Sequence, residues 1–400
     1  MEIQQSVLGE IAQHDGARVD SVDIGTLVRR LILFDRVIVK SVRLRELPAL
    51  VRAFGKTGLQ DLLASGLLKL SYEFTGIITD IHRNGVRDLP FECFSFGIAE
   101  VGKRDELLQK EMGSLRQVSG LKNHDREVIE EAVWNSIVRP GPSFGQHLLE
   151  QFDSDIRLNN PALKYSLLTP VRDALARPDL ALENLNVSVE ETEHRTFRII
   201  TNLKSDFNLP PEQSHYLLQS ALTAVSNLTM RLAEMEAYSA LTGFRESEAP
   251  LLFGRLAPII APQNPALVEG QFERIIRIAQ IPDFLPNQKV DVKKLFQVRE
   301  SSECRDFRAW LLSADKMTDS EIKKIAENMR SILGWLVGTP FGKGVRLTTT
   351  TLLGLIPVKG LVLGPMASAI DTFFVEKVFP KSGVVAFLHD QYPSLYKGNM

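Results

Sequence analysis

The side chains that most often bind metals are spread thinly along this 400-residue chain. A metal site needs several His, Cys, Asp or Glu ligands close together, but the seven histidines are scattered. His124-Asp125 and His389-Asp390 are two His-Asp pairs of this chain. In phosphohydrolases, such a pair binds a metal only when further histidines converge on it. The spacing around His82, His124 and Asp125 does not favour such convergence. We therefore predict no metal site.

Phosphate and cofactor motifs are also missing. A Walker-type loop needs glycine, four residues and Gly-Lys-Ser/Thr, so that backbone N–H groups and the lysine surround the phosphates. Residues 338–344 match only loosely, because Gly344 stands where a hydroxyl residue would hold magnesium. No Gly-x-Gly-x-x-Gly run follows a predicted strand, and no Gly-x-Ser-x-Gly elbow is present. We predict no cofactor.

Two remaining candidates for catalytic residues have simpler structural interpretations. A metal-dependent nuclease carries Glu-x-Lys on a strand, whereas Glu321-Ile-Lys323 opens a predicted helix in which Glu321 completes a capping box with Thr318. Cys93 lies in an apolar, strand-like run beside Phe94, which favours a buried core thiol over a nucleophile. The catalytic residues are thus unknown, and an enzyme with a dispersed site stays open as an alternative.

Composition narrows the class of protein. Lys and Arg number 47, and Asp and Glu number 49, so the formal net charge is −2. This balance argues against a dedicated nucleic-acid binder, which usually has a basic excess. The two cysteines, Cys93 and Cys304, do not make a secreted disulfide framework. Residues 1–20 lack the apolar region of a secretory signal, so we expect a cytoplasmic protein.

One segment is a candidate for function. Residues 352–370 are almost entirely apolar, with Lys359 as their single charge, and Pro357 and Pro365 break them into a helical hairpin. The hairpin is either the buried centre of a helical domain, wrapped by an amphipathic helix at 319–337, or a segment that enters a bilayer. The candidate membrane- or partner-contacting residues are Leu353, Leu355, Ile356, Lys359, Leu361 and Leu363.

Glycines and apolar periodicity predict a small α/β unit at the N-terminus. Residues 1–20 show no clear pattern, so we expect a loose start. Gly55 and Gly66 follow two short predicted helices, where a left-handed cap is favoured. A strand, two helices and a strand form a crossover, which predicts parallel pairing. The expected elements are a helix at 24–32 capped by Asp23, a strand at 36–40, helices at 47–54 and 59–63, and strands at 68–72, 76–81 and 91–101.

The middle of the chain is predicted to be helical with one β-hairpin. A helical stretch at 104–138 contains Trp134, which we expect to be buried. Apolar residues alternate on both sides of a charged stretch at 190–195, which predicts two antiparallel strands with a polar connection. Pro210 and Pro211 open a long helix with one apolar stripe. Further helices are expected at 146–176 and 271–280.

These patterns predict an α+β fold that is predominantly helical. We expect a small α/β domain at 1–103, a mostly helical central domain at 104–286 with a hairpin near 185–204, and an all-α C-terminal domain at 287–400. The first functional hypothesis is a non-enzymatic interaction or regulatory protein with an unknown protein partner. The alternative is a membrane-active, pore-forming-like effector of a bacterial toxin or defence system, conditionally inserted through residues 346–380. The layout resembles such proteins only in architecture.

Overall fold

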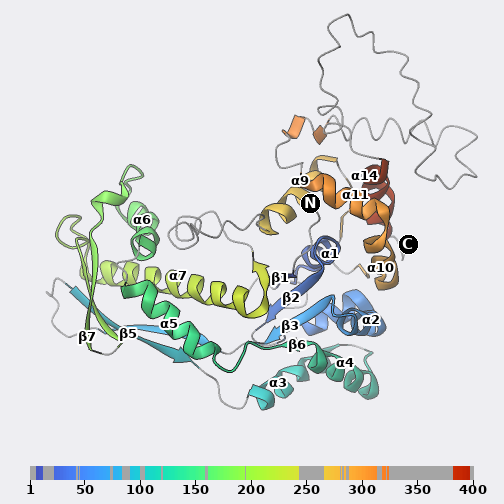
Figure 1. The fold of residues 1–400 in the computed structure, drawn as a ribbon, viewed down its shortest axis with the longest axis horizontal. Coiled ribbons are helices and arrows are strands. Elements are labelled where there is room, and N and C mark those ends of the chain that lie inside the picture. Colours follow the sequence, from blue (N-terminus) through green and yellow to red (C-terminus); the bar gives the residue numbers. More distant parts are fainter. Residues whose placement is uncertain are drawn as a thin grey trace, which may run out of the picture. The chain divides into compact units, whose positions relative to one another are not determined.

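The protein is described by a computed structural model (Figure 1), and the chain is mixed α/β and mostly helical, as predicted. Contacts divide it into two units that alternate along the chain. The first unit comprises Met1–Leu70, Glu111–Ile137 and Pro265–Met400, and the second comprises Ser71–Lys110 and Val138–Asn264. The described residues are 6–11, 22–41, 44, 46–72, 75–82, 91–99, 104–118, 120–157, 161–193, 195–242, 265–279, 281, 283–284, 288–312, 318–320, 322–323 and 382–396.

A sheet with parallel pairing organises the first unit. Its strands follow the order β6 (Ile137–Val138), β3 (Leu68–Tyr72), β2 (Arg36–Ser41) and β1 (Ser6–Gly9). β1 and β2 run parallel, in a register that pairs Ser6 with Arg36. The expected loose start at 1–20 is therefore wrong for β1. Its two buried residues, Val7 and Leu8, are too few to show an alternation in the sequence.

Local signals predicted the first helices of this unit close to their observed positions. Asp23 caps α1 (Ile24–Leu33), because its Oδ1 accepts a hydrogen bond from the backbone N–H of Thr26 at 2.8 Å. The two short helices predicted after it form one element, α2 (Leu47–Ala64), with a kink at Gly55. Gly55 and Gly66 both have positive φ angles, 67° and 74°, as the sequence predicted.

Shorter helices complete the first unit. α1 packs against α9 and α10, and α2 packs against α4. Trp134 on α4 is 40% exposed, so its predicted burial is wrong. The buried stripe of α4 contains Ile129 and Val133, and residue 134 lies beside that stripe. The helices of this unit are η2 (Gly113–Gln117), α4 (Asn123–Ser136), α9 (Pro265–Ala279), α10 (Val292–Glu300), α11 (Ser302–Leu311), α14 (Ser382–Ala386), η8 (Phe387–Gln391) and α15 (Tyr392–Ser394). Most of α3 (Arg104–Met112) belongs to the second unit.

The second unit is an antiparallel sheet covered by helices on one face. The strand order is β4 (Gly76–His82), β5 (Phe91–Ala99), β8 (Thr196–Thr201) and β7 (Val187–Glu193). The buried side chains of this sheet pack against the helices, and two of them, Phe94 and Phe197, stack with centroids 5.3 Å apart. The other elements are α5 (Phe144–Arg157), α6 (Pro161–Leu175), η3 (Leu182–Asn184), α7 (Pro211–Tyr238) and β9 (Ala240–Thr242).

The predicted hairpin is confirmed as β7 and β8, but its connection is shorter than expected. Glu190 to Glu193 belong to β7, and the turn is at Arg195, whose φ angle is 59°. Charged residues suit an edge strand, so their polarity does not mark the end of the strand. β8 also pairs with β5, which joins strands from both sides of the predicted boundary at 103/104. The domain boundaries at 103/104 and 286/287 stay predictions.

Candidate functional site

A cluster of buried aromatic rings in the first unit, here named the aromatic anchor, joins distant parts of the chain. Phe307 on α11 stacks on Phe387 at the start of η8, with centroids 4.3 Å apart and ring planes 18° from parallel. Phe272 on α9 lies 4.8 Å from Phe307 and 5.1 Å from Tyr392. All four side chains are fully buried. Rings in such contact contribute about 0.5–1.5 kcal/mol per pair beyond their buried area.

The aromatic anchor connects the chain before and after the apolar C-terminal segment. α11 precedes residues 313–381, α14 follows them, and these two helices pack against each other. Most of the predicted helix at 319–337 lies outside the described residues, and so does Glu321 of the capping box. The same holds for the loop at 338–344 and for all six candidate contact residues: Leu353, Leu355, Ile356, Lys359, Leu361 and Leu363.

A buried charge network lies beside the aromatic anchor. The side chain of Arg29 on α1 is only 6% exposed, and its guanidinium forms ion pairs with Asp283, at 3.0 Å, and with Glu273. The hydroxyl of Tyr392 donates to Asp283 Oδ1 at 2.5 Å. Burial is the main cause that raises the pKa of Tyr392 well above its ordinary value, and Tyr396 and Asp283 raise it further. The network ties α1 to segments more than 240 residues away in the sequence.

This network resembles a catalytic site only in having titratable groups that are buried together. Its charges are paired with one another, and the phenol and the guanidinium both bind the same carboxylate, Asp283. Breaking a buried ion pair costs about 3–5 kcal/mol, because one charge is then left uncompensated. We interpret the network as a structural tie.

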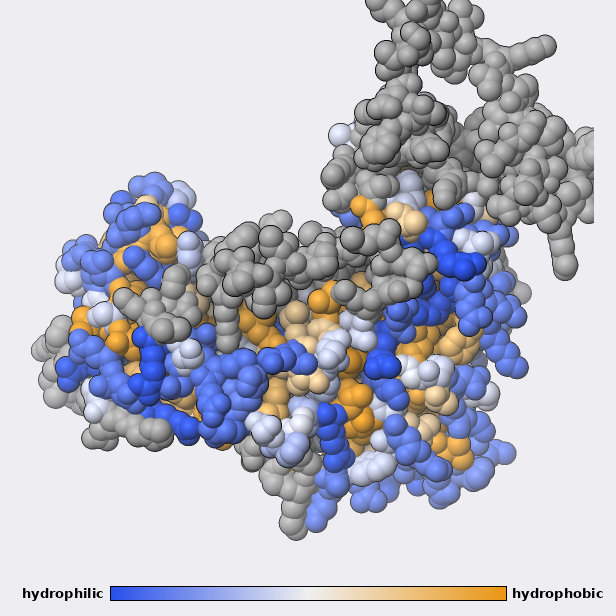
Figure 2. Space-filling view, in the orientation of Figure 1, coloured by the Kyte–Doolittle hydropathy of each residue, from blue (hydrophilic) through white to orange (hydrophobic). Residues whose placement is uncertain are grey.

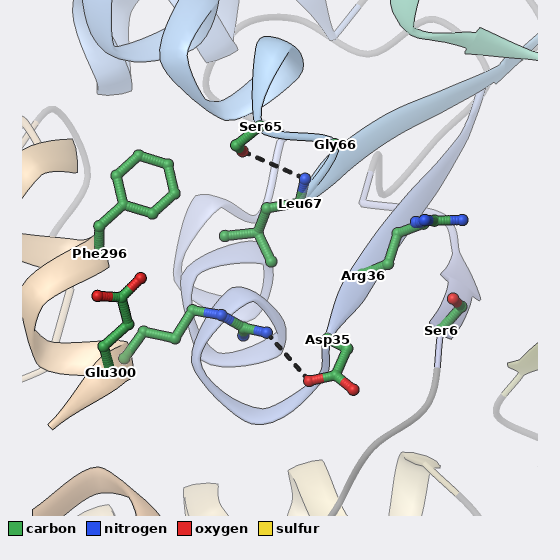
Figure 3. Close-up of a pocket in the computed structure, with 9 residues that line it drawn as sticks. Ser6, Asp35, Arg36, Ser65, Gly66, Leu67, Phe296 and Glu300 are labelled. Carbon is green, nitrogen blue, oxygen red and sulfur yellow. Dashed lines mark hydrogen bonds and ion pairs between the residues drawn. The ribbon is translucent and has the colours of Figure 1, made fainter. Parts of the chain in front are cut away.

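A pocket of about 350 Å³ opens at the amino ends of β1 and β2 (Figure 3). Ligands of open parallel sheets usually bind at the carboxyl ends of the strands, so this pocket is at the opposite edge. Four of its side chains are charged, and Phe296 and Leu67 add apolar surface. The residues that line the pocket are Ser6, Asp35, Arg36, Ser65, Gly66, Leu67, Phe296, Arg299 and Glu300.

Arg299 in the pocket wall completes the end of α1. Its Nη1 donates to the carbonyl oxygens of Leu31, at 2.5 Å, and of Phe34, and its Nη2 lies 3.3 Å from Asp35 Oδ1. The neighbouring Arg308 donates to the carbonyl of Ile32. The carbonyls at a helix C-terminus lack partners within the helix, and cations there are favourable. Burial, and then the charge of Arg308, lower the pKa of Arg299 to about 10.

Two other charged side chains at the pocket do not form such contacts. Arg36 and Glu300 are exposed, and their side chains make no hydrogen bond or ion pair with the part of the chain that the structure describes. Figure 3 shows them on opposite sides of the pocket, with Leu67 between them. These are the side chains of this site that can bind a ligand without breaking an existing pair.

A histidine of the second unit also joins a charged cluster. His215 Nδ1 on α7 and Lys204 Nζ each lie 3.3 Å from a carboxylate oxygen of Glu92 on β5. The Glu92 side chain is 13% exposed. A carboxylate that holds one imidazole nitrogen can orient the other for acid–base chemistry. The imidazole and the ammonium group share the Glu92 carboxylate, so we interpret the cluster as a tie between α7 and the sheet.

The residues singled out from the sequence are not brought together. Asp125 forms an ion pair with Lys56 at 2.6 Å and so connects α4 with α2. The described residues contain no group of three side chains that could hold a metal. Cys304 is buried, whereas Cys93 is only half-buried, because it alternates with the buried Phe94 on β5. The expected full burial of Cys93 is therefore wrong.

The face of the molecule drawn in Figure 2 is mixed in polarity. On the face shown in Figure 2, hydrophilic residues surround smaller hydrophobic areas. The large exposed hydrophobic residues of the described chain are Ile78, Trp134 and Tyr216. Among the described helices, none has the length and apolar content needed to cross a bilayer, a statement that does not extend to residues 346–380.

Comparison with known proteins adds no family. No protein-family model matches the chain, and no curated protein or solved structure shows significant similarity to it.

Proposed function

We propose that this chain is a non-enzymatic interaction protein that presents the apolar segment 346–380 to a protein partner from a fixed base. The observation that carries the proposal is the stacking of Phe307 on Phe387, at 4.3 Å, in the aromatic anchor. It fastens the chain on both sides of the segment to one unit. A fully buried Phe side chain stabilises the fold by about 1.5–3 kcal/mol.

The composition of the segment supports the same proposal. Residues 352–370 carry one charge, Lys359, and many branched apolar side chains. Burying such side chains against another protein surface removes them from water and so lowers the free energy of the complex. Because α11 and α14 pack against each other, the chain that connects them begins and ends at the same place, which lowers the entropy that it loses on binding.

A replacement inside the chain tests the proposal without removing the aromatic anchor. Residues 346–380 are exchanged for a Gly/Ser linker of about 12 residues, which reaches roughly 20 Å. A truncation at Pro340 would also remove Phe387 and Tyr392, which are fully buried. Loss of partner binding in that truncation could then not be distinguished from loss of folding. Cross-linking and affinity capture from the native host then compare the two chains.

We expect a partner that the full chain captures and the linker chain does not. A matched variant with Leu355, Leu361 and Leu363 changed to serine keeps the length of the segment and removes apolar contacts, so it should lose the partner as well. Capture of the same partner by all three chains would refute the proposal.

A membrane-active effector is the second candidate, favoured by the lone Lys359 in an otherwise apolar stretch. A lysine near the end of a membrane hairpin can reach the headgroup region. Flotation with anionic and neutral liposomes, and release of a trapped dye, test this candidate on the same three chains. Binding and release by the full chain alone would favour it over a protein partner.

A further inference from the structure

Helix α4 carries the large exposed hydrophobic residue of the described part of the first unit, Trp134. Figure 1 shows α4 at the rim of this unit beside α2, and the two helices pack against each other. The buried side of α4 contains Ile129 and Val133, whereas Trp134 is 40% exposed. Tryptophan is among the residues that contribute most to binding at protein interfaces. Its exposure on a helix that already has a buried side is typical of a contact surface.

Two carboxylates share the exposed side of α4 with Trp134. Glu131 precedes Trp134 by three positions and Glu127 precedes it by seven, so all three lie along one helix face. Both glutamates are exposed, and neither forms a hydrogen bond or ion pair with the residues that the structure describes. The neighbouring Glu130 is already paired with Arg126, at 3.4 Å. Side chains on a helix lean toward its N-terminus, so we expect the indole to lean toward Glu131.

The C-terminal end of α4 adds negative charge beside Trp134. α4 ends at Ser136, and its last turn contains no basic residue. The backbone at a helix C-terminus carries a partial charge of about minus half an electron. The next cation along the chain, Arg139, forms an ion pair with Asp105 at 2.6 Å. The exposed ring, the two carboxylates and the helix end therefore all favour a cation at this face.

We propose that this face of α4, here named the Trp134 face and formed by Glu127, Glu131 and Trp134, binds an arginine-bearing helix of a partner protein. A guanidinium can stack on an indole while it binds a carboxylate with two hydrogen bonds, which an ammonium group cannot do. Glu127 and Glu131 are one helical turn apart, about 6 Å along the axis. Arginines one turn apart on the partner match this spacing. The proposal does not depend on residues 346–380.

A fluorescein-labelled helical peptide serves as the probe. It has about 20 residues, a length at which an alanine-rich helix forms in water, with arginine at every fourth position. Fluorescence anisotropy measures its binding to the full chain at about 0.15 M salt, where distant exposed charges are screened. Two control peptides carry lysine or glutamine in place of arginine. We expect the arginine peptide to bind at least about tenfold more tightly than the glutamine peptide, and also more tightly than the lysine peptide.

Substitutions on α4 assign the binding to the Trp134 face. Trp134→Ala should weaken binding of the arginine peptide about tenfold and remove its preference over the lysine peptide. Glu131→Gln should weaken binding severalfold. Glu183→Gln is the matched control, because it removes the same charge from an exposed glutamate of the second unit and should leave binding unchanged. All three residues are exposed, so the variants should keep the fold, which circular dichroism verifies.

Three results would overturn the proposal. The first is that the arginine peptide does not bind at millimolar concentration, or binds the Trp134→Ala chain as tightly as the unsubstituted chain. The second is equal weakening by Glu131→Gln and Glu183→Gln, because the peptide would then respond only to net charge. The third is a dimer in sedimentation velocity that Trp134→Ala dissociates, because a second copy of the chain would then occupy the Trp134 face.

Discussion

The ring of Phe387 stacks on the ring of Phe307, 80 positions earlier in the sequence, with the centroids 4.3 Å apart. Because both rings are fully buried, the C-terminal segment from Ser382 to Tyr396 belongs to the core of the first unit. Its removal should therefore destabilise that unit.

Phe387→Ala should lower the free energy of unfolding by about 3–5 kcal/mol, because it leaves a cavity among the aromatic rings. Denaturation by urea, followed by circular dichroism, measures the change. Tyr216→Ala is the control, since that aromatic side chain is 69% exposed and its loss should cost less than about 0.5 kcal/mol. Equal losses in the two variants would contradict the assignment of Phe387 to the core.

Alkaline pH should destabilise the protein through Tyr392 and Tyr396. Burial is the main cause that raises the pKa of both phenols in the folded state. Above the ordinary tyrosine pKa of about 10, the unfolded chain loses these protons while the folded chain keeps them. The unfolded state then binds fewer protons, so the free energy of unfolding falls as pH rises.

Urea denaturation between pH 8 and pH 11 measures this effect. The contribution should be fully present below pH 10 and should decrease above it. Tyr396→Phe cannot lose the proton, so its stability should fall less steeply over the same range. A slope identical to that of the unsubstituted chain would show that Tyr396 ionises as easily in the folded protein as in the unfolded one.

Gly55→Ala should destabilise the protein by about 1–3 kcal/mol, the cost of holding a residue with a Cβ in a backbone region that favours glycine. Gly55 has φ 67° and ψ 169°, and an added Cβ would meet no atom within 4 Å, so the cost is that of the backbone alone. Gly113→Ala is the matched control, because that glycine has open space and no positive φ. Thermal denaturation of both variants should show a lower midpoint for Gly55→Ala only.

Cys304 should react with a thiol reagent only after the first unit unfolds. The side chain is fully buried, and burial raises the pKa of its thiol, which reduces the fraction of reactive thiolate. Cys93→Ser leaves Cys304 as the single cysteine of the chain, so the colour released by a disulfide reagent reports on this thiol alone. Release from the native variant at the rate seen in urea would place Cys304 at the surface.

The sequence by itself determined the elements whose signals are local. The cap at Asp23, the kink at Gly55, the turn after α2 at Gly66 and the start of α7 after Pro210 all depend on residues within one helical turn. The same is true of the hairpin, whose alternation repeats every two residues. The burial of single side chains was harder to predict than the elements themselves. Trp134 shows this, since an aromatic residue beside an apolar stripe can remain exposed.

Only the tertiary structure decided which distant residues meet. Arg29 binds Asp283 across 254 positions, and Lys204 lies 3.3 Å from Glu92 across 112 positions. The pocket combines Arg36 with Glu300 in the same way. Contacts of this kind depend on how helices and strands pack, and no fixed spacing in the sequence encodes them. The sequence therefore specified those helices and strands that carry a local signal, whereas long-range packing specified the charge network, the aromatic anchor and the pocket.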